Sequence, residues 1–554
     1  MKKLLFVFTF ISFAAGLFAQ EALKSTEEEY YDFLSLQGLV ERPTLGYRTL
    51  SDSVWNLQED TEHVWSQNNL GSTNVIWEPA DPAQNWFADG LFQGFTYKIY
   101  GPEWFNSYNN STPYGQNDGG LWQGRGYNTA LTTGIRFEGY GFELTLKPQL
   151  SWSQNEEFYI DNEIYPNPYS HSFHYGSVSH NIDIVQRYGD SSFWNFDWGD
   201  TEARWSWNSF TVGFGTQNPW LGPAYINPML GSNNAGGFLK LDAGLRQTNI
   251  IIPKLNINLG SIEGRVWVGQ LKESEYFDSD ETNDSRMVTG MSASYKCSFI
   301  PGLSVGLNRI FMTYWRTENF KYVLRLFTTK GGNALASSGN DEDQKFSLFV
   351  NWDFPKVGFN FFGEFGCDDF ANRRTNPFHT AIYTIGAKQY IPFLFGLKSE
   401  LNFEWNDFEM SQDFQFQWAY TGYYGHGFVN QGYTNNGQVL GAGSGWAGNS
   451  QFLQYKIYYP KGFTYFKFHR YCPNNNSVYS QAVYNKTDAV NGPVYSKWFA
   501  NFETYFCYGL HSQYYITNDF LVNAGIDYII IYNGNYSEDD KHTFRLECIF
   551  KYTL

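Results

Sequence analysis

The chain has 554 residues, with 38 Lys or Arg against 55 Asp or Glu, which gives a formal net charge of −17. This acidity disfavours a nucleic-acid-binding protein, because phosphate contacts need clustered Lys and Arg. Aromatic residues make up 20% of the chain and charged residues 17%, below the roughly 25% of a typical soluble domain. The mean hydropathy is negative, which disfavours a helical membrane protein. The composition favours β-strands with one apolar and one polar face.

Residues 1–19 are typical of a secretory signal peptide. Lys2 and Lys3 give a positive start, an apolar stretch runs from Leu4 to Leu17, and Ala19 is a small residue before the expected cleavage site. No later stretch reaches the ~18 consecutive apolar residues that a transmembrane helix needs. We therefore expect export across the inner membrane.

Residues 20–90 form a second predicted region, an N-terminal periplasmic helical segment. A short helix is expected near its start, because Ser25 precedes Glu28 with the spacing of a capping box. Gly38 is a natural stop for that helix. The first convincing strand is expected near Phe95.

From residue 91 to residue 554 the pattern becomes an alternation of apolar and polar residues, which is typical of β-strands. Tight turns such as Pro301-Gly302 and Pro355-Lys356 join some of these strands, and long polar connections such as Gly422–Gly448 join others. Short turns at one end and long loops at the other indicate an outer-membrane barrel, with roughly 16 to 20 strands of about ten residues. We predict an all-β transmembrane antiparallel β-barrel over residues 91–554, closed by its C-terminal strand.

The polar phase of these strands carries charges of both signs and is predicted to face the lumen. A strongly ion-selective porin would more often show a ring of one sign, whereas mixed charges can pair and fill the lumen. Leu401 belongs to the lipid-facing phase and Asn402 to the lumen phase, so an Arg should be costlier at Leu401. The charged residues of the lumen phase include Glu143, Lys147, Glu263, Arg265, Glu364, Lys398, Asp527, Arg545, Glu547 and Lys551.

Signals for catalysis or metal binding are weak. The sequence has no GxSxG elbow and no phosphate-binding loop. His171 and His174 lie in a polar loop without the adjacent Glu of a metalloprotease. Glu400 and Glu404 share a strand face, but four residues separate them by about 13 Å, too far for glycosidase chemistry. The five cysteines are scattered without a CxxC pair. We predict no catalytic residues, no metal site and no cofactor.

One segment is more specific. It runs from Phe214 to Pro223 as FGTQNPWLGP and from Asn227 to Phe238 as NPMLGSNNAGGF. This segment resembles the Wzi-type outer-membrane capsule assembly family, which carries a similar stretch after an early strand pair. The family usually has Pro where Gly236 stands here. We expect a structured loop that folds into or over the barrel mouth, held by the structural motif residues Pro219, Gly222, Pro223, Ser232 and Phe238.

The resemblance implies a barrel of eighteen strands with a small periplasmic helical piece and a lectin-like, non-enzymatic role. Surface polysaccharide of the capsule or lipopolysaccharide type would be the partner, with outer-membrane lipid around a barrel expected to be monomeric. The alternative is a channel or porin for small solutes. Aromatic rings stack on sugars and amides satisfy hydroxyl groups. The predicted polysaccharide-binding residues are Trp220, Asn233, Asn234 and Trp446.

Overall fold

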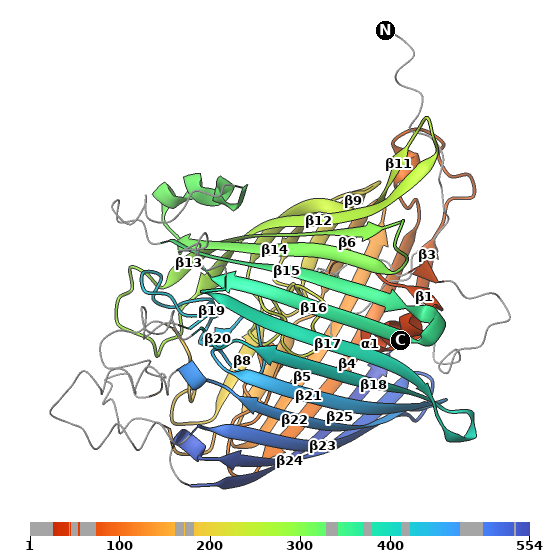
Figure 1. Cartoon of the computed structure of the whole chain (residues 1–554). Helices are drawn as coiled ribbons and strands as arrows, with labels where there is room; N and C mark the ends of the chain where they lie inside the picture. Colours follow the sequence, from red (N-terminus) through yellow and green to blue (C-terminus); the bar gives the residue numbers. More distant parts are fainter. Residues whose placement is uncertain are drawn as a thin grey trace.

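The chain folds into a closed antiparallel β-barrel, seen from the side in Figure 1. The computed structural model describes residues 26–43, 45, 54–55, 74–160, 171, 182–327, 342–368, 378–411, 422–476, 502–536 and 539–553. Within these residues the barrel has eighteen strand positions. The prediction of an all-β barrel of about eighteen strands is confirmed. The predicted signal peptide lies outside the described residues.

The strands of the barrel wall are long, and short helical turns join several of them. The helical elements are α1 (Thr26–Leu36), η1 (Ala88–Gly90), η2 (Thr317–Phe327), η5 (Pro355–Val357), η6 (Leu394–Gly396) and η7 (Gly534–Tyr536). The wall strands are β4 (Phe95–Asn109), β5 (Gly126–Gly139), β6 (Phe142–Leu146), β7 (Gln149–Ser153), β8 (Phe193–Asp197), β9 (Glu202–Trp207), β10 (Phe210–Gly215), β11 (Lys240–Ile252), β12 (Ile257–Lys272), β13 (Ser285–Cys297), β14 (Leu303–Tyr314), β15 (Glu342–Phe354), β16 (Phe359–Asp368), β17 (Ala381–Pro392), β18 (Lys398–Asp407), β21 (Asn449–Tyr459), β22 (Gly462–Cys472), β23 (Thr504–Tyr515), β24 (Phe520–Tyr532) and β25 (Lys541–Thr553). The short strand β3 (Asn74–Trp77) pairs with β4 at the edge of the wall. Outside the wall lie β1 (Val40–Glu41), β2 (Val54–Trp55), β19 (Thr434–Asn435) and β20 (Gln438–Val439).

Two strand positions are interrupted. Strands β6 and β7 both pair with β5, so together they fill one position, and β8 and β9 fill the next by pairing with β7 and β6. The break between β6 and β7 falls at Pro148, which has no backbone N–H to give to a ladder. The sequence alternation predicts one strand here, whereas the structure has two short strands. Their outward-facing residues keep the same alternation across the break.

The barrel closes between its first and last wall strands. Strand β25 pairs with β24 on one side and with β4 on the other, where Leu546 lies opposite Tyr108. Closure by the C-terminal strand, which the sequence predicts, is confirmed. A closed barrel leaves no exposed strand edge in its wall.

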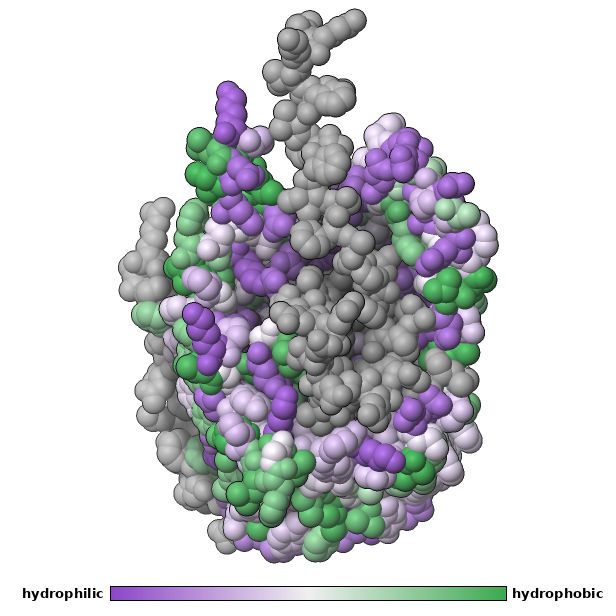
Figure 2. Space-filling view, turned by 90° about the vertical axis from the view of Figure 1, so that its right-hand side faces the viewer, coloured by the Kyte–Doolittle hydropathy of each residue, from purple (hydrophilic) through white to green (hydrophobic). Residues whose placement is uncertain are grey.

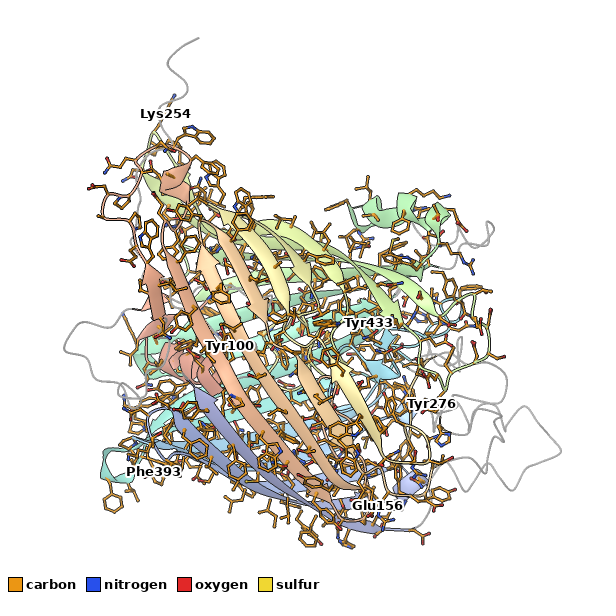
Figure 3. All side chains as sticks on the ribbon, turned by 180° about the vertical axis from the view of Figure 1, so that it is seen from behind. Tyr100, Glu156, Lys254, Tyr276, Phe393 and Tyr433 are labelled. Carbon is orange, nitrogen blue, oxygen red and sulfur yellow. The ribbon has the colours of Figure 1, made fainter. Side chains whose placement is uncertain are left out.

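The two ends of the barrel differ. Short turns gather at the end where α1 lies, since Gly38, just after α1, approaches Pro355 in the turn between β15 and β16. The long connections lie at the opposite end, which we call the mouth. In Figure 3 Phe393 lies at the short-turn end, and Glu156 and Tyr276 lie at the mouth.

The wall has an apolar outer face and a polar inner face. Along β18, Phe403 points outward and is 41% exposed, while Asn402 and Glu404 point inward and are buried. Figure 2 looks onto the short-turn end and shows hydrophilic side chains gathered around the central hollow and hydrophobic ones along the outer wall. The outer face is therefore suited to lipid.

Helix α1 lies inside the barrel. Its apolar residues Tyr30, Phe33 and Leu34 are fully buried against inward-facing residues that include Tyr458 of β21, whose ring stacks on Phe33 at 3.9 Å. Its acidic residues pair with inward-facing lysines of the wall, Glu27 with Lys98 and Glu29 with Lys456, each at 2.8 Å. The helix therefore closes much of the short-turn end.

In the described parts of the chain, every helix is too short or too polar to cross a membrane.

Candidate functional site

The loop between β10 and β11, residues 216–239, contains the specific sequence segment and folds into the barrel. Pro219 and Pro228 restrict the backbone, and Gly222 adopts a φ of +100° that a side chain would disfavour. The backbone N–H of Leu221 donates to the carbonyl of Gly231 at 3.0 Å, which draws the two halves of the loop together. The loop therefore has a defined, hydrogen-bonded structure, as its prolines and glycines predict.

A single carboxylate of the wall anchors the inner turn of this loop. Glu404, buried on the lumen face of β18, accepts hydrogen bonds from the backbone N–H groups of Tyr225, Ile226 and Asn227 at 2.5, 3.1 and 2.9 Å. The Asn227 side chain also donates to Asn406 at 3.0 Å. These bonds satisfy donors that the lumen would otherwise leave unpaired.

A second segment, residues 422–448, packs on the loop from the mouth side. The hydroxyl groups of Tyr424 and Tyr433 donate to the carbonyls of Met229 and Leu230, each at 2.7 Å. The hydroxyl group of Ser232 donates to the carbonyl of Gly441 at 2.5 Å. Figure 3 shows Tyr433 within the barrel outline. The sequence predicts residues 422–448 as a surface loop, whereas much of the segment is buried inside the barrel.

The loop reaches from the mouth to the helix at the other end. The Tyr225 hydroxyl group donates to the Glu29 carboxylate of α1 at 2.7 Å. Residues 216–239, residues 422–448 and α1 therefore form a continuous packed column through the lumen. Such a column leaves the barrel filled along its axis.

Charged side chains of the inner wall pair with one another. Arg204 bonds to Glu202 at 2.9 Å and to Asp242 at 2.7 Å, and Arg545 bonds to Asp527 at 2.8 Å and also to Glu547. The mixed charges of the lumen phase therefore form ion pairs within a strand and between nearby strands, as the sequence predicts. Buried pairs of this kind fix the geometry of the wall more than they stabilise it.

A cavity of about 660 Å³ opens at the mouth above the packed column. Its wall comes from at least six segments that are distant in sequence. Aromatic rings that line it are those of Tyr114, Trp122, Phe158, Tyr159, Trp446, Tyr471 and Tyr505. Side-chain amides that line it are those of Gln116, Asn117, Gln123, Gln186, Asn234, Gln438 and Asn535. Rings and amides are the groups that bind sugar faces and hydroxyl groups.

One carboxyl group of this cavity has a shifted pKa. Burial raises the pKa of Asp118 to about 6, although the cation of Arg545 and a hydrogen bond from Gln123 oppose the shift. Glu547 adds to the shift and Lys467 opposes it. The charge of the cavity therefore changes near pH 6.

This shift predicts a pH-dependent effect of Asp118→Asn on stability. The pKa of Asp118 in the folded chain is above the roughly 3.9 of an unfolded Asp. The folded state then holds the proton more tightly, so this residue's contribution to stability falls as the pH rises from about 4 to 6. We expect the Tm of Asp118→Asn to rise relative to that of the wild type as the pH increases from about 4 to 6. Asp81→Asn, which removes an exposed carboxylate, serves as the control, and identical pH profiles for the two variants would contradict the assignment.

The predicted polysaccharide-binding residues have different places in the structure. Asn234 and Trp446 line the cavity, and the Asn234 amide also donates to the carbonyl of Val439 at 2.9 Å. Trp220 is 2% exposed and its indole N–H donates to the carbonyl of Ala224 at 2.9 Å, so its ring packs the loop from within. Asn233 is half-buried, and its backbone carbonyl accepts from the N–H of Gly119 at 2.6 Å.

The structural motif residues lie within the packed part of the loop. Pro219, Gly222, Ser232 and Phe238 are buried, and Pro223 is half-buried. The N–H of Ser232 donates to the carbonyl of Leu440 at 2.8 Å, which ties the loop to residues 422–448.

Sequence reasoning missed part of the cavity wall. Residues 111–125, between β4 and β5, supply Tyr114, Asp118 and Trp122. This stretch has the same mixture of Gly, amide and aromatic residues that singles out residues 422–448. The same compositional criterion would have found it.

Among the described residues, no group of three or more His, Cys, Asp or Glu is arranged to hold a metal ion. His171 contacts Asp190 at 2.9 Å, and its predicted neighbour His174 lies outside the described residues. The five cysteines are free thiols.

The sequence matches the family model described as capsule assembly protein Wzi over residues 109–546, most of the chain. The chain belongs to this family. A comparison with curated protein sequences finds no significant match. The Wzi family and the closed barrel together make the chain an outer-membrane protein.

The chain is similar to several solved structures. One is Wzi of Escherichia coli, described as an outer membrane protein involved in group 1 capsule assembly and a carbohydrate binding β-barrel. It is 13% identical, with 83% of this chain and 85% of that chain covered and a TM-score of 0.55. OprB of Pseudomonas putida is 12% identical, with 83% and 94% covered and a TM-score of 0.38. OccAB1 of Acinetobacter baumannii is 10% identical, with 86% and 99% covered and a TM-score of 0.39.

Proposed function

We propose that the protein binds surface polysaccharide at the barrel mouth and so organises or attaches capsule-type polymer at the cell surface. Membership in the Wzi family supports this role, as does the carbohydrate binding described for the Escherichia coli barrel of the same fold. The proposed role is binding without catalysis, because the mouth offers aromatic rings and amides that can hold a sugar chain.

The observation that carries the proposal is the cavity above a filled lumen. Trp122, Tyr159 and Trp446 present aromatic surface to a space of about 660 Å³, large enough for a short run of sugar rings. Below it the packed column of residues 216–239, residues 422–448 and α1 blocks further entry. A ligand that binds there stays at the surface.

A channel for small solutes is the other candidate, and the same column argues against it. Loop residue Tyr225 and helix residue Glu29 meet inside the lumen at 2.7 Å, where a porin needs open water. Planar-bilayer recordings of the purified chain separate the two roles. Large, stable openings would favour the channel.

Several associated features belong to the same proposal. Residues 1–19 would act as the signal peptide, residues 20–90 as the periplasmic segment and residues 91–554 as the barrel, which would work as a monomer. Short turns such as Pro355–Val357 would then face the periplasm and the mouth would face the outside. A Cys placed at Lys356 should therefore resist an impermeant reagent on whole cells, while one placed at Gly443 should react.

Trp446→Ala tests the binding site. The ring lines the cavity, and an aromatic contact contributes about 0.5–1.5 kcal/mol beyond buried area, so we expect retention of polysaccharide to fall about two- to tenfold. The measurement compares cell-associated with shed polymer in a deletion strain that carries each variant.

Trp86→Ala is the matched control, because Trp86 is 76% exposed and contacts Trp207 beside the short turn between β9 and β10, far from the mouth. It should retain polymer like the wild type. Equal retention in the deletion strain and the wild type would reject the proposed function altogether.

A further inference from the structure

Helical segment η2 lies outside the barrel rather than over its mouth. It follows β14 and folds back along that strand, where the Asn319 amide donates to the hydroxyl group of Thr313 at 3.1 Å. Further along, the guanidinium group of Arg309 donates to the carbonyl of Leu326 at 2.9 Å. Arg309 and Thr313 are four residues apart on β14, so η2 covers about 13 Å of the strand.

The phase of β14 shows which side of the wall η2 covers. Asn308 faces the lumen, where it bonds to Ser292 and Ser347, so Arg309 and Thr313 face outward. Val305, in the same outward phase, is 42% exposed, whereas Phe311 is only 3% exposed. Phe311 lies between Arg309 and Thr313, the two residues that bond to η2. In Figure 1 this segment is the green helix outside the wall, beside the mouth ends of β13 and β14.

The side of η2 that points away from the wall is apolar. Phe320, Leu324 and Phe327 are 43%, 68% and 61% exposed. Large apolar side chains at this exposure are costly in water. Next to the lipid-facing wall these side chains can instead contact the acyl chains of the membrane.

Cations accompany these apolar residues. Arg316 and Lys321 are exposed, and Arg325 lies beside them with its guanidinium group over the Tyr322 ring at 5.5 Å. Arg325 also pairs with Glu342 at 4.0 Å, and residues 316–327 carry three cations against one carboxylate, Glu318, in a chain whose net charge is −17. Apolar residues beside Lys and Arg are the pattern of helices that lie in a membrane interface.

We propose that η2 binds a phosphorylated lipid of the outer leaflet, with Phe320, Leu324 and Phe327 among its acyl chains and Arg316 and Lys321 on its phosphate groups. The occupant is a lipid because the segment lies against the outward face of β14 at Arg309 and Thr313, and further along the strand the same face presents Val305 to the membrane. The anionic phosphate complements the cations, and the acyl chains cover the exposed rings. The lipid site is separate from the polysaccharide cavity and does not rest on the proposed function.

Binding of purified lipid A to the full-length chain in detergent micelles tests the proposal by native mass spectrometry. The double substitution Arg316→Glu with Lys321→Glu should weaken binding at least tenfold. Wild type should bind dephosphorylated lipid A at least tenfold more weakly than the phosphorylated form. Leu324→Ser removes the apolar contact without adding charge and should also weaken binding.

Lys254→Glu is the matched control for charge reversal, because Lys254 is an exposed cation in the turn between β11 and β12, at the opposite end of the barrel (Figure 3). It should bind lipid A like the wild type. All variants should keep heat-modifiable migration on gels, which reports a folded barrel. Equal lipid A binding by wild type and the double variant would overturn the proposal. A variant that instead changes the mass of the oligomer, with lipid binding intact, would assign the η2 face to a second copy of the chain.

Discussion

Glu404→Ala should strongly destabilise the folded barrel. The substitution leaves the backbone N–H groups of Tyr225, Ile226 and Asn227 without their acceptor in a buried place. Each unpaired buried donor costs about 1–3 kcal/mol, so a total loss of roughly 3 kcal/mol or more is expected. Urea titration of the chain refolded into lipid vesicles measures the change.

The control for this substitution is Glu400→Ala on the same strand and face. Glu400 is also buried, but the hydrogen bond it receives from the Tyr458 hydroxyl group is long, at 3.3 Å. Its loss should therefore cost clearly less. Glu404→Gln keeps an acceptor oxygen and should fall between wild type and Glu404→Ala. Similar losses for the two alanine variants would mean that the loop does not depend on its carboxylate anchor.

Glu404→Ala should also reduce polysaccharide retention, because the same loop carries Asn234 to the cavity wall. The carboxylate acts through the loop and does not touch the cavity. Restoring retention with Glu404→Gln would separate a positioning role from general damage to the barrel.

Much of the fold follows from the sequence because strands have a period of two. The alternation through Phe346 and Phe354 predicts β15, and the Pro355-Lys356 turn lies where it is expected. The ends of strands are harder to predict. Phe395 continues the apolar phase of β18 in the sequence, yet it lies in the η6 turn with a φ of +60° and is 98% exposed. Alternation alone does not mark where the ladder of hydrogen bonds stops.

The candidate site is less predictable because its wall is assembled across long sequence distances. Trp446 and Asn234 are recognisable from composition and resemblance, but Tyr505 follows the loop between β22 and β23 and carries no local sign of its neighbours. Met229 of the loop likewise belongs to a buried cluster with Tyr423 and Tyr424, some 200 positions away in the chain. Loop packing of this kind is a property of the closed barrel, not of any local pattern.

The filled lumen also corrects one expectation about tolerance to charge. On the polar phase of β18, an Arg at Asn402 is predicted to be milder than an Arg at Leu401. In the structure Asn402 is 1% exposed. An Arg at this position would be overpacked and desolvated, so we expect Asn402→Arg also to destabilise the barrel.

Leu401→Arg tests the membrane-facing assignment without that complication. Leu401 lies on the outward phase near the middle of β18, between Gln389 of β17 and Tyr455 of β21. An Arg near the bilayer midplane of a barrel costs about 2–4 kcal/mol, and folding into vesicles should weaken by that amount. Leu401→Ala removes the same packing without adding charge, so the difference between the two variants isolates the cost of placing the cation in lipid. Equal stabilities for Leu401→Arg and Leu401→Ala would mean that water, not lipid, surrounds this face, and the transmembrane assignment of β18 would be wrong.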